Sequence, residues 1–238
     1  MISIGDGLYV GSPNLCFLQM ANRLAFPKLL ELGFELCGTY ALPVPGAASE
    51  ATDASQTSLY NRKPLTSKKS LIAFAEQMAG VSGAKAALKA LHSIADSSAS
   101  PMETILTILL TLPFRYGGYG FPLPEMNAKI RPAKTAKQNS NQSLYICDLY
   151  WPDVEVVAEY DSDTYHTGSD RISHDSQKRN SLEAMGVTVV TVTNRQISSI
   201  MQFEKVAKQI AVNMGRRMQY ENPQFTQAQL QLRRTLGL

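Results

Sequence analysis

The stretch that decides the fold is residues 144–161, which read LYICDLYWPDVEVVAEYD. It holds two runs rich in apolar and aromatic residues, Leu144–Trp151 and Val154–Asp161. Only Pro152 and Asp153, two turn-forming residues, separate these runs. Strand-like runs joined by such a short turn predict an antiparallel β-hairpin.

The predicted hairpin gathers acidic residues on one face. With the turn at these two residues, Asp148 lies opposite Val157 and diagonal to Glu159, ~7–8 Å away. Because side chains alternate along a strand, Asp148, Glu159 and Asp161 emerge on the same face. Two carboxylates at that separation can share one hard cation. The alternative is ordinary acidic residues at strand ends, with Asp161 capping the next loop. The opposite face carries the apolar residues Val154, Val156 and Ala158.

The segments around the hairpin alternate between helical and strand patterns. A turn containing Gly117, Gly118 and Gly120 lies upstream, and Gly186 is the expected end of a downstream helix. The order from residue 100 is helix, three strands, helix, strand, helix, which predicts an α/β fold with a mixed central sheet between helices. In chain order we expect a helix over Ser100–Leu112, a strand over Ala128–Arg131, a polar linker over Pro132–Ser143, the hairpin, a helix over Asp170–Met185, a buried strand over Val187–Val192, a helix over Ser198–Met214 and a short helix after Pro223.

The first 97 residues have a different pattern. Apolar residues recur at helical spacing after Ser12-Pro13, a good helix start, and two Ala-rich helices are expected over Ser67–Ala79 and Lys85–Ala95. The stretch Pro43–Ser58 is poor in residues to bury and is expected to be a flexible loop. We therefore expect a mainly helical region over residues 1–97 and a second domain over 98–238.

Composition excludes several classes of protein. The chain has 238 residues, 44% hydrophobic and 18% charged, so it can bury a core. It contains no run of ~20 apolar residues that could span a membrane, and no signal peptide is visible. Its three cysteines lack C-x-x-C spacing, which disfavours disulfides and zinc. We expect a soluble, cytoplasmic protein with free thiols.

Charge is unevenly distributed, although the net charge is only +3. Residues 148–175 contain eight acids and one base, whereas residues 176–238 contain nine bases and three acids. An acidic cluster beside a basic region suits a protein that binds a divalent cation and contacts phosphates. Solvated helix faces are the alternative explanation.

The acids of the hairpin belong to a longer ordered pattern. Asp148 is followed by Glu159-x-Asp161, then His166, then Asp175-x-x-Lys178, and finally Leu182-x-x-x-Gly186-Val187. This pattern resembles the PD-(D/E)XK nuclease superfamily, and within it the subgroup of very-short-patch repair endonucleases and their bacterial relatives. Upstream, Ser100-Pro101-Met102-Glu103 resembles the Ser-x-x-Glu start of that subgroup. The resemblance covers roughly residues 100–214 and implies a restriction-endonuclease-like core.

The resemblance also implies roles for individual residues. Asp148 and Glu159 would bind Mg²⁺ or Mn²⁺, with Asp161 as a further ligand, and Glu103 would reach the metal site. His166 would assist catalysis. The superfamily lysine would stand at the position of Asp161, and here Lys178 on the next helix, or else His166, would replace it.

Simpler roles exist for the same residues. Ser100 and Glu103 form a capping-box pattern around Pro101. His166 suits an ordinary loop, and Lys178 suits a solvent-exposed helix position.

The expected function is metal-dependent hydrolysis of DNA phosphodiester bonds, in repair or defence. Lys178, Arg179 and Arg195 are expected to contact the nucleic acid, and the basic C-terminal helices would hold its backbone. The alternative is a weakly active or inactive nuclease-fold module. Such a module resembles the antitoxins of abortive-infection toxin–antitoxin systems and would bind DNA or a protein partner such as a toxin. No recognition-helix pattern lies near Met1, so sequence-specific repression by this chain alone is not expected.

Overall fold

The computed structural model describes residues 2–42, 60–131, 144–162, 169–218 and 223–238. The loop expected over Pro43–Ser58, the linker over Pro132–Ser143 and His166 lie outside these residues. The chain divides into two compact units. One comprises Met1–Ile108 with Gln231–Gly237, and the other comprises Leu109–Leu230 with Leu238.

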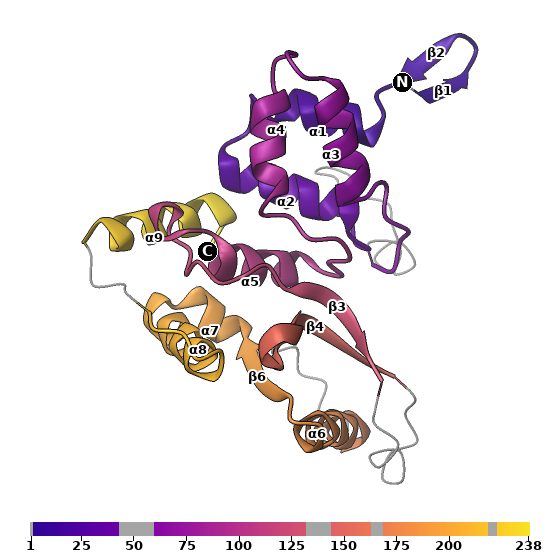
Figure 1. Cartoon of the computed structure of the whole chain (residues 1–238). Coiled ribbons are helices and arrows are strands. Elements are labelled where there is room, and N and C mark those ends of the chain that lie inside the picture. The colour runs from indigo at the N-terminus through magenta and orange to yellow at the C-terminus, as the bar shows by residue number, and fades with distance from the viewer. Residues whose placement is uncertain (1, 43–59, 132–143, 163–168, 219–222) are drawn as a thin grey trace, which may run out of the picture. The chain divides into compact units, whose positions relative to one another are not determined.

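The first unit is mainly helical, as expected. Its helices include α1 (Pro13–Met20), α2 (Phe26–Cys37), α3 (Lys68–Gln77) and α4 (Ala84–Leu91). The Ser12 hydroxyl accepts a hydrogen bond from Leu15 N at the start of α1, and Gly83 precedes α4 with φ 98°. Hence the predicted starts of these two helices are confirmed. The hairpin β1 (Ile2–Gly5) and β2 (Leu8–Val10) comes before α1 (Figure 1).

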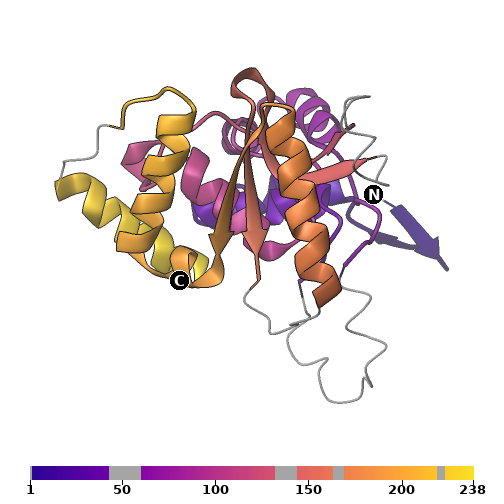
Figure 2. The ribbon, with the colours of Figure 1, turned by 90° about the horizontal axis from the view of Figure 1, so that it is seen from below.

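The second unit is built on a four-stranded mixed sheet with the order β3-β4-β5-β6. Strands β3, β4 and β5 are antiparallel neighbours, and β5 runs parallel to β6. Helix α6 lies on one face of the sheet and α8 on the other (Figure 2). The mixed sheet flanked by helices is therefore confirmed. The strands of this unit are β3 (Glu125–Ile130), β4 (Tyr145–Trp151), β5 (Val156–Asp161) and β6 (Thr188–Thr193), and its helices are α6 (Ser169–Ala184), α7 (Asn194–Ser198) and α8 (Ile200–Asn213). Helices α5 (Pro101–Thr111) and α9 (Pro223–Leu236) each contribute residues to both units.

The expected turn between β4 and β5 was too short. Residues Pro152–Val154 form a 3-10 turn and Glu155 adopts the left-handed conformation, with φ 51°. The connection thus takes four residues, and Tyr150 pairs with Val157. This register is shifted by two from the expected one. Val154 belongs to the turn and is 40% exposed, so it does not contribute to the buried face as expected.

Two other expectations need correction. Strand β6 is not buried along its length, because Thr188 is exposed and only Val190 and Val192 are buried. The helix after Pro223 is not short, since α9 runs for 14 residues. By contrast, α6 ends where expected. Gly186 has φ 83°, and Val187 N donates to Leu182 O at 3.0 Å, as in a Schellman motif.

The glycine-rich turn after α5 packs closely inside the second unit. Gly117 has φ 86° and Gly120 has φ 66°. A Cβ atom at Gly117 would lie 2.4 Å from the carbonyl oxygen of Ala228, whereas one at Gly120 would meet only the Phe114 ring, at 3.7 Å. The turn brings Tyr119 against the rings of Phe203 and Phe225. Both glycines therefore have left-handed backbone conformations, but only Gly117 lacks room for a side chain.

We predict that Gly117→Ala destabilises the protein more than Gly120→Ala. Both substitutions force alanine into the left-handed region, at ~1 kcal/mol. Only Gly117→Ala adds a clash with backbone, for a total of roughly 2–4 kcal/mol. Urea denaturation measures both values, and equal losses would contradict the packing described for Gly117.

Candidate functional site

A pocket of about 240 Å³ lies between β5, β6 and α6, next to Asp148 of β4. Asp148, Glu159 and Asp161, the three predicted acids of the hairpin, all line it. The two-residue shift in register preserves the face on which each side chain emerges. The remaining lining residues are Tyr160, Lys178, Arg179, Leu182, Val189 and Thr191.

Asp148 and Glu159 lie just beyond the last backbone pair between β4 and β5. That pair is Leu149–Ala158, and Asp148 precedes Leu149 while Glu159 follows Ala158. Asp148 Oδ2 accepts a hydrogen bond from Tyr160 N at 2.8 Å, so this carboxylate is turned toward β5. The charge of Asp148 acts on Glu159, so the two acids lie close enough to interact.

The surroundings oppose ionisation of both acids. Burial and, after it, the charge of Asp148 together raise the pKa of Glu159 to about 7 against the opposing effects of Lys178 and Cys147. Burial also raises the pKa of Asp148, while the hydrogen bond from Tyr160 N partly offsets that rise. Two carboxylates held this close keep their charges only with a cation between or beside them.

Lys178 supplies one positive charge from α6. Its Nζ lies 2.8 Å from Glu159 Oε1, and its side chain is 25% exposed. Burial by itself would lower the pKa of Lys178, but the charge and hydrogen bond of Glu159 outweigh burial and raise it. The expectation that Lys178 joins the acidic cluster is met by this geometry, in contrast to the solvent-exposed alternative.

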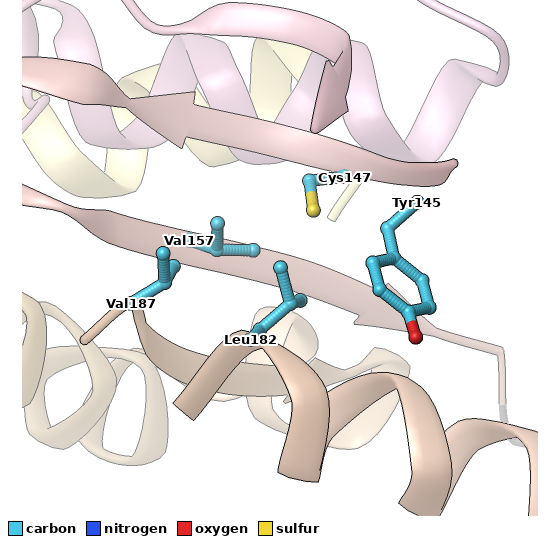
Figure 3. Packing of buried hydrophobic residues seen from close by; sticks show 5 residues of the cluster. All are labelled: Tyr145, Cys147, Val157, Leu182 and Val187. Carbon is cyan, nitrogen blue, oxygen red and sulfur yellow. The ribbon is translucent and has the colours of Figure 1, made fainter. Parts of the chain in front are cut away.

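A hydrophobic cluster supports the site from α6 and the hairpin. Figure 3 shows Cys147 and Tyr145 of β4 pointing toward Leu182 of α6. Val157 and Val187 complete the buried cluster. Leu182 is fully buried one helical turn after Lys178, so the packing of Leu182 turns Lys178 toward the sheet.

Cys147 is a site neighbour that the sequence pattern did not single out. Its thiol is buried and forms a hydrogen bond with Glu159, and burial raises its pKa to about 12. It is therefore a protonated, unreactive thiol that donates to the carboxylate. Its position next to Asp148 in the sequence was the available signal, but a lone cysteine without a C-x-x-C spacing gave no reason to use it.

Arg179 lies at the exposed rim of the pocket. Its guanidinium donates a hydrogen bond from Nη2 to Thr191 Oγ1 on β6. This contact orients an exposed positive charge beside the two acids. Arg195, in the last turn of α7, is exposed and is not among the residues lining the pocket.

Glu103 has a structural role in the first unit. Its backbone N donates to Ser100 Oγ at 3.1 Å, and its carboxylate accepts from Ala99 N at 2.9 Å. The pattern is a variant of the predicted capping box, with Ala99 in place of the cap residue as donor. The hydrogen bonds of Glu103 thus account for its burial, and its predicted reach to a metal site stays a prediction.

The donor set fits a hard divalent cation with few protein ligands. Two carboxylates meet in the pocket, and Asp161 is exposed at its edge. Within the described ranges, no group of three or more His, Cys, Asp or Glu side chains converges as a metal cage would. Mg²⁺ commonly takes one or two carboxylates and keeps several waters, so a pair suffices.

Comparison with known proteins adds no relative. No family model matches the chain, and neither does any curated protein or solved structure. Among the described residues, no helix is both long and apolar enough to cross a membrane.

We predict a pH-dependent stability that Glu159→Gln abolishes, measured in EDTA. Because the pKa of Glu159 is about 7 in the folded protein and 4.5 as its ordinary value, the folded state binds more protons between these values. Its contribution to the free energy of unfolding therefore falls as pH rises from ~4.5 to ~7 and is constant above that window.

The measurement is urea denaturation of both proteins at several pH values. The difference in unfolding free energy between Glu159→Gln and the unchanged protein should shift in favour of the variant across this window. A difference that does not change with pH would show that Glu159 ionises normally.

Proposed function

We propose that this chain is a metal-dependent nuclease with a restriction-endonuclease-like core, acting on DNA phosphodiester bonds. The observation that carries the proposal is the half-buried pair Asp148 and Glu159, which line one pocket with Lys178 against Glu159. The family pattern quoted from the sequence supplies the substrate class, and the mixed sheet flanked by helices is consistent with the proposed core.

Asp148 and Glu159 are the residues that would hold Mg²⁺ or Mn²⁺, with Asp161 reached through water. When bound, the cation lowers the pKa of a water molecule and offsets charge on the scissile phosphate. The hydrogen bond from Tyr160 N fixes the Asp148 carboxylate before any cation arrives. Such preorganisation reduces the reorganisation that the site must undergo during reaction.

Lys178 and Arg179 would act on the phosphate. Lys178 lies where an ammonium can orient a water molecule or stabilise the charge that develops on the oxygens of the scissile phosphate. Arg179, braced by Thr191, presents a guanidinium at the pocket rim, where it can bind a backbone phosphate without reading sequence. His166 and Arg195 retain their proposed roles from the sequence pattern, as catalytic helper and nucleic-acid contact.

One observation favours the second candidate, an inactive nuclease-fold module that binds DNA or a protein partner. The Lys178 ammonium already neutralises Glu159 through a direct ion pair. A carboxylate that is already paired with an ammonium can persist as a structural feature without metal. Calorimetry with Mn²⁺ followed by incubation with plasmid separates the two, since metal uptake with cleavage supports the nuclease. Tight partner binding with no metal uptake supports the module.

We predict that Asp148→Ala and Glu159→Ala each abolish Mg²⁺-dependent cleavage of plasmid DNA while the protein stays folded. Each substitution removes half of the carboxylate pair. The matched control is Asp153→Ala, because Asp153 is an exposed acid in the turn of the same hairpin. Circular dichroism verifies the fold. Residual cleavage equal to that of the control would refute the mechanism.

Arg179→Ala should weaken DNA binding and leave Mn²⁺ affinity unchanged. Loss of one phosphate contact should also reduce the slope of log affinity against log salt by ~1. Arg23→Ala is the control, since Arg23 is an exposed arginine of the first unit. Fluorescence anisotropy with a labelled duplex at several salt concentrations measures both variants. An unchanged slope for Arg179→Ala would exclude a phosphate contact.

A further inference from the structure

The ammonium of Lys178 lies at the place where the acidic pair needs positive charge. Nζ is 2.8 Å from Glu159 Oε1, and the side chain is three-quarters buried. This contrasts with the ion pair between Lys208 and Glu204, which has the same 2.8 Å length but lies on the exposed surface of α8. The ion pair of Lys178 is therefore part of the pocket, whereas that of Lys208 is a surface contact.

The packing of α6 fixes this position. Leu182 is fully buried against Val157 and Val187, and Lys178 precedes it by one helical turn on the same face. The next residue, Arg179, is tied to Thr191 of β6. With the helix anchored at Arg179 and Leu182, it cannot turn Lys178 away from the sheet, so only the side chain itself can leave Glu159.

A divalent cation and the Lys178 ammonium would compete for the same oxygen. A hard metal ion lies ~2.0–2.6 Å from its carboxylate ligands, and the ammonium already contacts Glu159 Oε1 at 2.8 Å. Two cations placed on one oxygen repel each other strongly in a partly buried pocket. The long, flexible lysine stem lets the ammonium leave Glu159 while the helix stays in place.

We infer that Lys178 is the resident cation of the Asp148–Glu159 pair and that a divalent metal must displace it to bind. The inference rests on the proposed function, and it means that competition from Lys178 lowers the affinity of the site for metal. Once displaced, the ammonium is free to contact a phosphate. Metal uptake and release of the lysine are one event in this arrangement.

The experiment is calorimetric titration of the full chain with Mn²⁺. Lys178→Met removes the competing charge and should bind Mn²⁺ roughly tenfold more tightly, within the usual range of coupling between sites. Lys178→Arg keeps the charge and should not gain affinity. Lys208→Met is the matched control, because it removes an exposed lysine with the same ion-pair length, and its affinity should equal that of the unchanged protein.

Thermal denaturation gives a second readout that does not depend on cleavage. Without metal, Lys178→Met should melt at a lower temperature than the unchanged protein, since its acids have lost their cation. Saturating Mn²⁺ should then raise its melting temperature by more than that of the unchanged protein. If Lys178→Met does not fold, Lys178→Gln replaces it, because the amide keeps a hydrogen bond to Glu159 without the charge.

The outcomes separate the inference from the proposed function. Equal or weaker Mn²⁺ binding by Lys178→Met, with clear binding by the unchanged protein, overturns the competition and leaves the metal-dependent nuclease standing. Absence of Mn²⁺ binding in every protein overturns the proposed function, and the inference with it. Tighter binding by Lys178→Met alone supports the inference.

Discussion

Repulsion between two carboxylates governs the arrangement of this site. Asp148 of β4 and Glu159 of β5 line the same pocket, and partial burial together with the charge of Asp148 opposes ionisation of Glu159. Two contacts offset this unfavourable charge. A backbone N–H of Tyr160 binds Asp148, and the Lys178 ammonium binds Glu159. Each partner comes from a fixed element, so the pair is stable only while β5 and α6 stay in their places.

The alternation of side chains along a strand explains why the three acids could be grouped from the sequence although the turn was not predicted correctly. The Pro152-Asp153 dipeptide is typical of a tight two-residue connection, but the chain instead forms a 3-10 turn that ends with Glu155 in the left-handed conformation. The additional two residues shift the register by two. Since faces alternate with a period of two, a shift by two leaves the expected face of the acids unchanged, and all three line one pocket. A turn longer by a single residue would have sent Asp148 and Glu159 to opposite faces.

The elements themselves were the most predictable feature, because each rests on a local signal. Gly186 ends α6, Ser12 starts α1, and the period of apolar residues identifies the strands and helices. Partners across the sheet were less predictable. The contacts of Cys147 with Glu159 and of Arg179 with Thr191 join residues that are 12 apart, and no local pattern specifies such pairs. These contacts depend on the twist and register that only the assembled sheet defines.

The orientation of Lys178 could have been argued from the sequence with one more step. Leu182 is the large apolar residue nearest the end of α6, and a residue that makes the Schellman contact with Val187 must face the core. Lys178 lies one turn earlier on that face, so its stem must run along the sheet toward whatever acids the sheet presents. Asp161 lies at the exposed end of β5, and the ion pair of Lys178 is with Glu159 instead. Hence a lysine carried on a helix can serve a carboxylate pair on a strand even though the strand position itself holds an acid.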